Sequence, residues 1–451
     1  MSHFPKNILI LGAGSSGIAA AKLAAKQKNI VTLLDEKTPN NANLLFKELQ
    51  GYPVQQVMNF NKKQFPDTYD LIIVSPGIAL DCKLGRLAAA SGAPICSELA
   101  YAAQYCPWPM LAITGTNGKT TTVEMLTHCL NTAQKKAIAG GNIGLPLSQI
   151  ILDAPPLDYV ILEISSFQLE QSPPEKLHPQ AAAVLNITPD HLNRHHDFET
   201  YKQLKLSILK NSKTTLAVYH ENLQVSLPNL HGITFSAQPH SKADFQYQKN
   251  ALGQQKEKKF CPLIQTDQLP FIGLHNYENA LAVLAIAFSI GIAPESMLPG
   301  LKTFRTGAHR IEKIAQHNGV TYINDSKATN VDAVIQALLS IGKDSPKIIL
   351  IAGGVDKKCS LKELVPYLQK FVKQIYLIGA CRDRLNQSWQ TVVSTHICES
   401  LEDAVQHSVA TAKDGDIVLL SPACASQDMF KSYIERGNVF TNVVKRMTAQ
   451  L

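Results

Sequence analysis

Long hydrophobic runs are missing from this sequence of 451 residues. None approaches the about 18 consecutive apolar residues that a membrane-spanning helix needs, so we expect no membrane span. Residues 1–6 lead directly into a short apolar run, without the long apolar core of a signal peptide. The sequence therefore predicts a cytoplasmic protein.

Cysteine pairs and basic stripes are missing too. The nine cysteines are scattered without any Cys-x-x-Cys spacing, which favours reduced thiols over disulfides or a structural zinc site. The net charge is only +7, and no dense stripe of Lys and Arg is interleaved with aromatic residues. We therefore expect no nucleic-acid partner, whereas polyanionic small substrates such as nucleotides suit a mildly basic protein.

What the sequence does contain is a regular alternation of short apolar runs and helical patterns. This alternation is typical of α/β proteins, in which helices cover both faces of parallel sheets. The runs that we expect to form strands are 8–11, 31–34, 71–74, 111–113, 160–162, 182–185, 348–351, 375–378 and 417–420.

At roughly 150 residues per domain, the length predicts about three domains, and the pattern separates three sets of elements. The first spans residues 1–97 and ends where a strand-like segment gives way to a helix around 98–103. The second spans 98–305, and its polar stretch between roughly 226 and 270 is interpreted as short strands and loops. The third spans 306–451.

The most specific motif is Thr-Gly-Thr-Asn-Gly-Lys-Thr-Thr-Thr at residues 114–122, directly after an apolar run. A buried strand that breaks into such a loop is typical of a phosphate-binding site rather than an ordinary glycine turn. Backbone N–H groups would surround phosphate oxygens, Lys119 would reach the terminal phosphates, and the Thr120 hydroxyl would bind magnesium. The usual first glycine is replaced by Ile113, so this loop is shorter than the common one.

A second glycine motif, Gly-Ala-Gly-Ser-Ser-Gly, occupies residues 12–17, between the run 8–11 and a strand that ends at Asp35. Its glycines allow a pyrophosphate to approach a helix N-terminus, and the acid about 20 residues later accepts a hydrogen bond from a sugar or base. NAD, another diphosphate such as a UDP-sugar, and a structural glycine turn all remain open. Residues 75–78 end another strand of this domain and are expected near the same crevice.

Charged side chains near further strand ends are candidates for chemistry. Glu163 follows a strand, where open α/β sheets bind ligands, and is either a magnesium ligand beside Thr120 or a solvated glutamate. His191 lies in a segment rich in histidine, for which a magnesium or nucleotide role, a capping role and a zinc site remain open. Lys205, taken alone, is most simply a solvated lysine on an amphipathic helix.

Polar clusters also follow three strands of the third domain, at 324–330, 353–357 and 421–426. Hydroxyl, lysine and carboxylate groups that meet at one sheet edge predict a site for a small anionic substrate, with unrelated loop chemistry as the alternative. In the second domain, residues 275–279 open an apolar helix. Their amides either bind an adenine or cap that helix.

Together these motifs resemble the Mur ligases over nearly the whole chain, and the clusters at 324–330 and 421–426 are similar to those of the glutamate-adding branch. The resemblance implies a Rossmann-like N-terminal domain for a UDP substrate, a central P-loop ATPase domain with a mostly parallel sheet, and a Rossmann-like C-terminal domain for the amino acid. It also implies a monomeric ATP-dependent ligase that adds D-glutamate to UDP-N-acetylmuramoyl-L-alanine through an acyl phosphate in peptidoglycan synthesis.

The resemblance assigns roles to individual residues. ATP would be bound by Gly115, Thr116, Asn117, Gly118, Lys119, Thr120, Thr121, Asn276, Asn279, Arg310 and Asp325. The UDP substrate would be bound by Ser15, Ser16, Asp35, Gly77 and Asn142, and glutamate by Thr329, Lys357, Ser426 and Tyr433. Catalysis would fall to Lys119, Glu163, His191 and Lys205, and two Mg²⁺ ions to Thr120, Glu163, His191 and Lys205. The family carbamylates the matching lysine, so Lys205 would become an oxygen ligand.

Other functions remain open. Another Mur ligase or a folylpolyglutamate-type ligase is the nearest alternative. An NAD-dependent oxidoreductase would explain residues 12–17 but would leave residues 114–122 idle. A nucleotide switch without enzymatic activity would explain the phosphate loop but would leave the clusters of the third domain unused.

Overall fold

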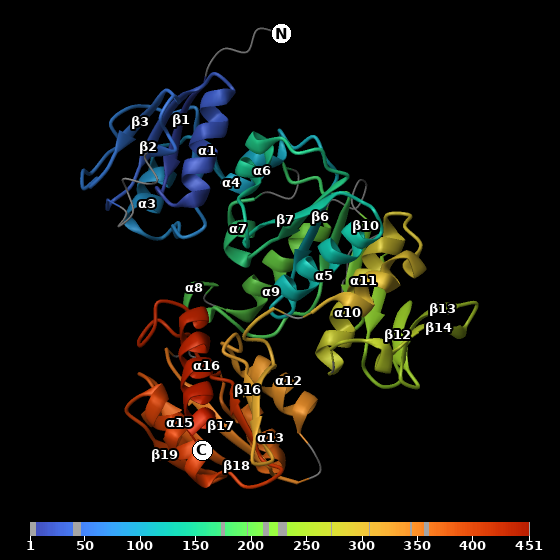
Figure 1. The fold of residues 1–451 in the computed structure, drawn as a ribbon. Coiled ribbons are helices and arrows are strands. Elements are labelled where there is room, and N and C mark those ends of the chain that lie inside the picture. The colour runs from blue at the N-terminus through green and yellow to red at the C-terminus, as the bar shows by residue number, and fades with distance from the viewer. Residues whose placement is uncertain are drawn as a thin grey trace. The chain divides into compact units, whose positions relative to one another are not determined.

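The computed structural model describes residues 6–38, 47–172, 176–195, 197–210, 216–223, 232–271, 273–305, 307–342, 345–355 and 360–450. In this part the chain forms three β-sheets with flanking helices (Figure 1), so the α/β prediction is confirmed. Contacts group the chain into two compact units. Unit 1 contains Met1–Ile187, Lys202–Gln265 and Asn279–Lys302, and unit 2 contains Thr188–Tyr201, Thr266–Glu278 and Thr303–Leu451.

The first sheet of unit 1 is parallel throughout and has the order β3-β2-β1-β4-β5. Its central strands are continuous apolar runs, as expected where helices cover both faces. The strands predicted at 8–11, 31–34 and 71–74 are confirmed. The elements are β1 (Asn7–Leu11), α1 (Ser15–Lys26), β2 (Ile30–Leu34), β3 (Val54–Val57), β4 (Leu71–Val74), α3 (Lys83–Ala90) and β5 (Ile95–Ser97).

The second sheet has the order β14-β13-β12-β11-β10-β9-β6-β8-β7, and only β12, β13 and β14 pair in antiparallel fashion. The polar stretch that we interpreted as short strands forms β11 to β14 at one end of this sheet. The strands are β6 (Met110–Thr114), β7 (Ala137–Gly141), β8 (Tyr159–Glu163), β9 (Ala181–Val184), β10 (Leu216–His220), β11 (Ile233–Ser236), β12 (Phe245–Gln248), β13 (Ala251–Lys256) and β14 (Lys259–Gln265).

The helices in this part of the chain include the one expected around 98–103. They are α4 (Glu98–Ala103), α5 (Lys119–Thr132), α6 (Leu147–Asp153), α7 (Ser166–Glu170), α8 (Leu192–His195), α9 (Phe198–Leu206), α10 (Leu274–Ser289) and α11 (Leu298–Thr303). Short 3₁₀ helices lie at Ser207–Leu209, Thr266–Gln268, Pro294–Met297 and Lys362–Leu364.

Strand β6 is the key element of the second sheet because it lies between β8 and β9. The chain leaves β6, forms β7 at the edge, returns to β8 on one side of β6 and then adds β9 on the other. Such a reversal of strand order opens a crevice at the carboxyl ends of the strands. The phosphate loop follows β6 and therefore begins at this crevice.

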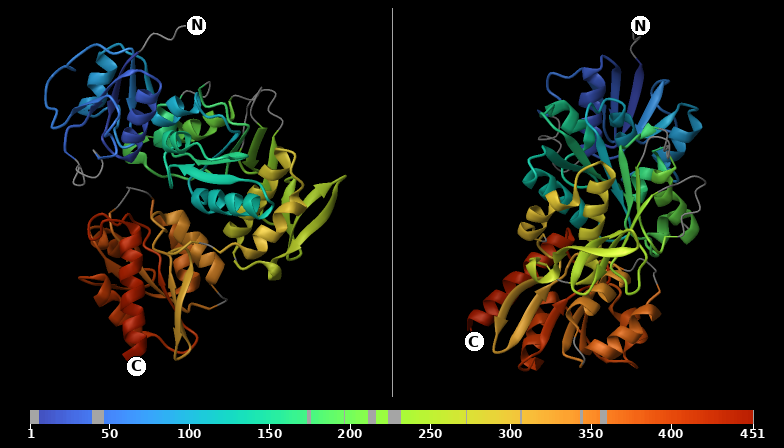
Figure 2. Two further views of the ribbon diagram at one scale, coloured as in Figure 1. Left: turned by 45° about the horizontal axis from the view of Figure 1, so that its top comes forward. Right: turned by 90° about the vertical axis from the view of Figure 1, so that its right-hand side faces the viewer.

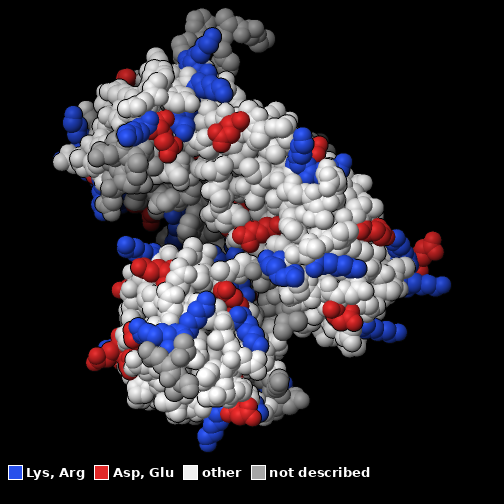
Figure 3. All heavy atoms as spheres, viewed as in Figure 1, with Lys and Arg blue, Asp and Glu red and all other residues white. Residues whose placement is uncertain are grey.

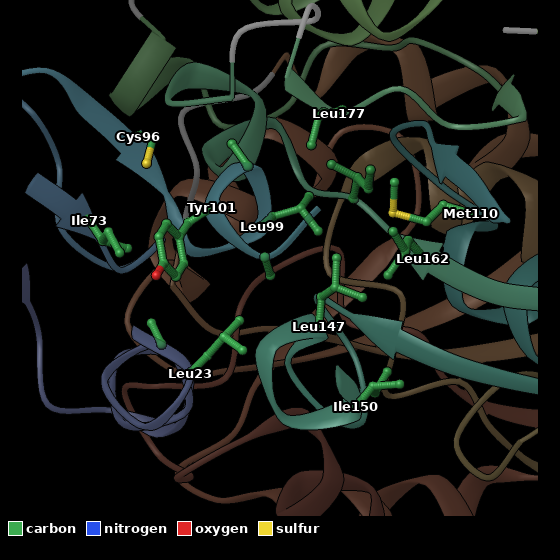
Figure 4. Close-up of a cluster of buried hydrophobic side chains, with 14 of the residues drawn as sticks. Leu23, Ile73, Cys96, Leu99, Tyr101, Met110, Leu147, Ile150, Leu162 and Leu177 are labelled. Atoms are coloured by element: carbon green, nitrogen blue, oxygen red, sulfur yellow. The ribbon is translucent and has the colours of Figure 1, made fainter. Parts of the chain in front are cut away.

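One apolar core serves both sheets of unit 1 (Figure 4). It contains Leu23 of α1, Tyr101 of α4 and Leu147 of α6, together with Ile73 of the first sheet and Leu162 of the second. Because these helices share one buried cluster, they bury each other's apolar faces. The boundary that we predict near residue 97 is therefore crossed by a continuous core.

The third sheet belongs to unit 2 and has the order β15-β16-β20-β17-β18-β19, with β15 alone antiparallel to its neighbour. One apolar cluster contains residues of α12, α13 and α14, and another contains residues of α15 and α16. The ribbon of this part of the chain, orange to red, shows helices on both sides of the sheet (Figure 2). The elements are β15 (Glu312–His317), β16 (Val320–Asn324), α12 (Val331–Ile341), β17 (Ile348–Gly353), α13 (Val365–Phe371), β18 (Val372–Ile378), α14 (Arg382–Trp389), β19 (Ser394–Ile397), α15 (Leu401–Thr411), β20 (Ile417–Leu420) and α16 (Tyr433–Gln450).

The molecular surface carries charges of both signs, which are interspersed on the face shown in Figure 3. Among the described residues, no helix has both the length and the apolar character that a membrane crossing requires. The described cysteines are free thiols, as the scattered spacing predicted.

Candidate functional site

The phosphate loop joins β6 to α5 through a glycine that the geometry requires. Gly118 has φ +82, in the left-handed region, and immediately precedes the first residue of α5. A Cβ atom at this position would lie 2.4 Å from Oδ1 of Asn279. No side chain caps the N-terminus of α5, so the N–H groups of its first turn can bind an anion.

Two lysines meet at one carbonyl oxygen of this loop. Nζ of Lys119 donates to the carbonyl oxygens of Gly115 and Thr116, both at 2.9 Å. Nζ of Lys205 donates to the same Gly115 oxygen at 2.7 Å, and the Lys205 side chain is buried. The interpretation of Lys205 as a solvated lysine is therefore wrong, because α9 packs this face against the loop. Two ammonium groups on one oxygen create a strongly electropositive spot.

Glu163 ends β8 opposite Ile113 of β6, which places it at the start of the loop. Its side chain is only 2% exposed, and Oε1 accepts a hydrogen bond from Nδ2 of Asn142 at 2.8 Å. The other oxygen, Oε2, is buried without a hydrogen-bond partner. An unpaired buried carboxylate oxygen is costly. A hard cation bound there would remove this cost, so Glu163 fits a magnesium ligand.

Asn142 and Asn279, both predicted to bind ligands, also make hydrogen bonds within the site. Asn142 contacts Glu163, and Asn279 contacts α5. The backbone N–H of Asn142 donates to the Glu163 carbonyl at 2.8 Å, so its backbone and side chain both contact Glu163. Oδ1 of Asn279 accepts from the Thr122 hydroxyl on α5 at 3.2 Å. Thr120 and Thr121 lie in the first turn of α5, as the motif required.

Asn186 contacts the phosphate loop, although no motif assigned a role to it. It follows β9, and its backbone carbonyl accepts from Thr116 N–H at 2.9 Å. Its side-chain Oδ1 accepts from Asn117 N–H at 2.8 Å, and its Nδ2 donates back to the Asn117 carbonyl at 3.1 Å. No sequence pattern signalled this contact, because the partners lie 69 positions apart.

Of the residues predicted to bind the UDP substrate, Ser15, Ser16, Asp35 and Gly77 follow strands of the first sheet, whereas Asn142 follows β7 of the second sheet. Ser15 and Ser16 begin α1, which has no side-chain cap, so its N-terminus can also bind an anion. Oδ2 of Asp35 accepts from Ala13 N–H at 2.8 Å, which fixes the glycine turn. The Ser75 hydroxyl donates to the Gly12 carbonyl at 3.2 Å and ties the end of β4, two positions before exposed Gly77, to this turn.

The three polar clusters of the third domain follow β16, β20 and β17, which are neighbours in the third sheet, so they begin at the same sheet edge. Arg436 of α16 is buried beneath them. Its guanidinium donates to the carbonyl oxygens of Ser326 at 2.8 Å, Cys424 at 3.1 Å and Gly353 at 3.4 Å. One side chain therefore fastens the three loops together.

Asp325 is a buried carboxyl group at the same edge. Burial raises its pKa to about 7, against smaller lowering effects from the Ser421 hydroxyl, the Ile311 N–H, Arg310 and Arg436. The Ser421 hydroxyl donates to Oδ2 at 2.8 Å, and Ile311 N–H donates to Oδ1 at 3.3 Å. Arg310 and Asp325, both predicted to bind ATP, are thus electrostatic neighbours.

Tyr433, predicted to contact glutamate, lies beside a cation. Nζ of Lys327 is 4.0 Å from the centre of the Tyr433 ring. Ser426, another predicted glutamate contact, is buried in the loop after β20, and Thr329 is half-buried in the loop after β16. Lys357 lies outside the described residues.

His191 and Asn276 belong to unit 2, whereas Lys119, Thr120, Glu163 and Lys205 belong to unit 1. Nε2 of His191 lies 3.6 Å from Oδ2 of Asp190, and Nδ2 of Asn330 donates to the same oxygen at 3.4 Å. Within the described part of the chain, no group of three or more His, Cys, Asp or Glu residues is placed to bind a metal ion.

Comparison with known proteins places each part of the chain in the same family. A MurD-like N-terminal domain matches residues 6–97, a Mur ligase middle domain matches 113–287, and a Mur ligase glutamate ligase domain matches 309–424. The UDP-N-acetylmuramoylalanine–D-glutamate ligase of Thermoanaerobacter sp. (strain X514) is 34% identical, and the alignment covers 98% of both chains.

Solved structures share the fold. UDP-N-acetylmuramate-alanine ligase MurC from Thermotoga maritima aligns with a TM-score of 0.62 at 20% identity, over 99% of this chain and 100% of that one. MurF ligase from Thermotoga maritima, in complex with ADP, aligns with a TM-score of 0.61 at 16% identity, over 96% and 99%. From its agreement with the curated relative over nearly its full length, we conclude that this chain belongs to the Mur ligase family.

Proposed function

We propose that this protein is an ATP-dependent ligase that adds D-glutamate to UDP-N-acetylmuramoyl-L-alanine in peptidoglycan synthesis. The proposal is supported by the curated relative with that name, which matches over 98% of both chains. The three domain matches include one specific to the MurD-like N-terminal domain.

The observation that carries the proposal is an electropositive phosphate loop beside Glu163, whose Oε2 is buried without a hydrogen-bond partner. Lys119 donates to the Gly115 oxygen, and Gly118 opens helix α5, which has no side-chain cap. These groups attract the phosphates of ATP. An NAD-dependent oxidoreductase would have no use for them.

The chemical problem is that a carboxylate resists attack by an amine, because its oxygen is a poor leaving group. We propose that the carboxylate oxygen of the alanyl group attacks the γ-phosphorus of ATP and that ADP leaves, which gives an acyl phosphate. The Lys119 ammonium would stabilise the charge on the transferred phosphoryl oxygens. The glutamate nitrogen then attacks the acyl carbon, inorganic phosphate leaves, and the nitrogen loses a proton, so an amide bond has formed.

We propose that Mg²⁺ is held by Thr120, Glu163, His191 and a carbamylated Lys205. Mg²⁺ would neutralise the phosphate oxygens of ATP. The unpaired Oε2 of Glu163 supports the proposal for that residue. A carbamate on Lys205 would keep one N–H for the Gly115 oxygen, and it would remove the repulsion between the two ammonium groups at that oxygen.

Phosphate release tests the function. UDP-N-acetylmuramoyl-L-alanine together with D-glutamate should stimulate ATP hydrolysis, and one amide bond should form for each phosphate released. Other acceptors, including L-glutamate, alanine and folate substrates, should not. If another acceptor alone stimulates phosphate release, the protein is a different ligase of the same superfamily.

Lys205 gives a separate test of the carbamate. Lys205→Ala should lose most activity, and short carboxylic acids should restore part of it by supplying the missing oxygen ligand. Full activity of the variant without added acid would contradict the carbamate role and would leave the ligase assignment intact.

A further inference from the structure

The short phosphate loop is held from outside by one residue of the neighbouring strand segment. Asn186, two positions after the end of β9, makes three hydrogen bonds to two consecutive loop residues. Its backbone carbonyl accepts from Thr116 N–H, and its side chain both accepts from Asn117 N–H and donates to the Asn117 carbonyl. A primary amide that pairs with both the N–H and the C=O of one residue fixes the orientation of the two peptide groups that flank this residue.

This arrangement decides which backbone groups of the loop can face a phosphate. The N–H groups of Thr116 and Asn117 point to Asn186. The loop then leads into the start of α5, which has no side-chain cap. The orientation of that helix start depends on Gly118, the residue directly after Asn117.

Close packing reinforces the clamp. A Cβ atom at Gly115 would lie 3.0 Å from Cβ of Leu185, the residue before Asn186. The loop and the segment after β9 therefore approach so closely that neither can move far without the other. A loop shorter than the common one has fewer backbone groups with which to hold its own shape, and this external clamp substitutes for them.

We propose that Asn186 is a positioning residue for nucleotide binding: it sets the conformation of the phosphate loop through Thr116 and Asn117 without touching the nucleotide. The inference rests on the proposed function insofar as the loop binds ATP. Loss of the clamp leaves the loop mobile, so the bound nucleotide must order it, and affinity falls.

The chain offers a matched control at the other end of α5. Asn131 makes the same reciprocal pair: its Oδ1 accepts from Ala137 N–H at 3.0 Å, and its Nδ2 donates to the Ala137 carbonyl at 2.9 Å. This pair joins α5 to β7 rather than to the phosphate loop. Asn186→Ala and Asn131→Ala therefore remove equivalent bonds, and only the first of them holds the loop.

Calorimetric titration with ADP is the primary test. We expect at least tenfold weaker ADP binding in Asn186→Ala than in the wild type, and unchanged binding in Asn131→Ala. The KM for ATP should rise in parallel, while the KM for the UDP substrate stays constant. Equal ADP affinity in the wild type and Asn186→Ala, or equal losses in both variants, would overturn the inference. If the wild type itself does not bind ADP, the proposed function fails.

Hydrogen exchange provides a second measurement that needs no ligand. Asn186→Asp keeps the shape and the acceptor for Asn117 N–H but turns the donor into an acceptor. A peptide that covers residues 114–122 should exchange faster in Asn186→Asp than in the wild type, and at the wild-type rate in Asn131→Asp. Unchanged exchange of that peptide would show that Asn186 does not order the loop.

Discussion

At the scale of single residues, each unit buries charged side chains near its strand ends. Oε2 of Glu163 has no hydrogen-bond partner, and Lys205 places a buried ammonium next to that of Lys119. Asp325 is buried among groups that only partly offset its desolvation. Such groups destabilise a protein in the absence of a ligand. Their concentration at the strand ends therefore points to binding.

Glu163→Gln should lower ligase activity by at least about a hundredfold, because the amide fills the same space but is a poor magnesium ligand. Glu98→Gln is the matched control: Glu98 is also buried, and its Oε1 accepts from Ser148 N–H at 2.8 Å. Kinetic assays over a range of Mg²⁺ concentrations compare the two variants. A similar loss in both would mean that any buried carboxylate of unit 1 is needed for folding.

Asp325 should make folding depend on pH. Its folded pKa of about 7 exceeds the ordinary value of 3.8 for an aspartate, so between these values the folded state holds a proton that the unfolded state has lost. The free energy of unfolding therefore falls as pH rises from about 4 to 7, by up to about 4 kcal/mol from this group, and is flat above that.

Urea unfolding at pH 5, 6, 7 and 8 tests this dependence. The difference in unfolding free energy between wild type and Asp325→Asn should change steadily up to about pH 7 and then level off. Ser421→Ala removes a hydrogen bond that lowers the pKa of Asp325, so it should shift the levelling to higher pH. A difference that does not vary with pH would exclude the raised pKa.

At the scale of elements, neighbouring segments pack closely against the junction between β6 and α5. Gly118 combines a left-handed backbone with a position where a Cβ would meet Oδ1 of Asn279. The strand before it is fully buried, and the neighbours β8 and β9 bring Glu163 and Asn186 to the same edge. The junction therefore tolerates glycine alone.

Gly118→Ala should weaken ADP binding and destabilise the fold by more than about 1 kcal/mol, because backbone strain and a steric clash add together. Gly291→Ala isolates the strain: Gly291 has φ +80, and a Cβ there would meet nothing within 4 Å. Thermal unfolding and ADP titration of both variants separate the two effects. Equal destabilisation in the two would show that Asn279 moves away without cost.

At the scale of the whole molecule, the two units differ in how many sheets contribute to one apolar core. In unit 1, α1, α4 and α6 contribute to one cluster that joins both sheets. The sheet of unit 2 has two clusters, which take residues from α12 to α14 and from α15 and α16. A unit whose apolar clusters lie within its own elements can fold by itself.

A fragment of residues 307–451 should therefore unfold cooperatively on heating, as followed by circular dichroism. A fragment of residues 1–97 lacks α4 and α6, which cover α1. It should expose apolar surface, bind a hydrophobic dye and show no cooperative transition. Cooperative unfolding of the shorter fragment would mean that the first sheet needs no cover from the second.

The sequence by itself determined what is local. Apolar runs located nine strands, and Gly118 with Lys119 identified the phosphate loop, because strand periodicity and turn chemistry depend on neighbours along the chain. Family resemblance extended this to distant residues such as Arg310 and Asp325. Strands with weak apolar character, such as β7 and β19, had no such signal.

Only the tertiary structure decided what depends on distant partners. The burial of Lys205 against Gly115, the clamp of Asn186 on Asn117 and the raised pKa of Asp325 all come from contacts between segments far apart in sequence. Burial and electrostatic environment are properties of the packed molecule, since a lysine on an amphipathic helix looks the same in sequence whether its face meets water or a phosphate loop.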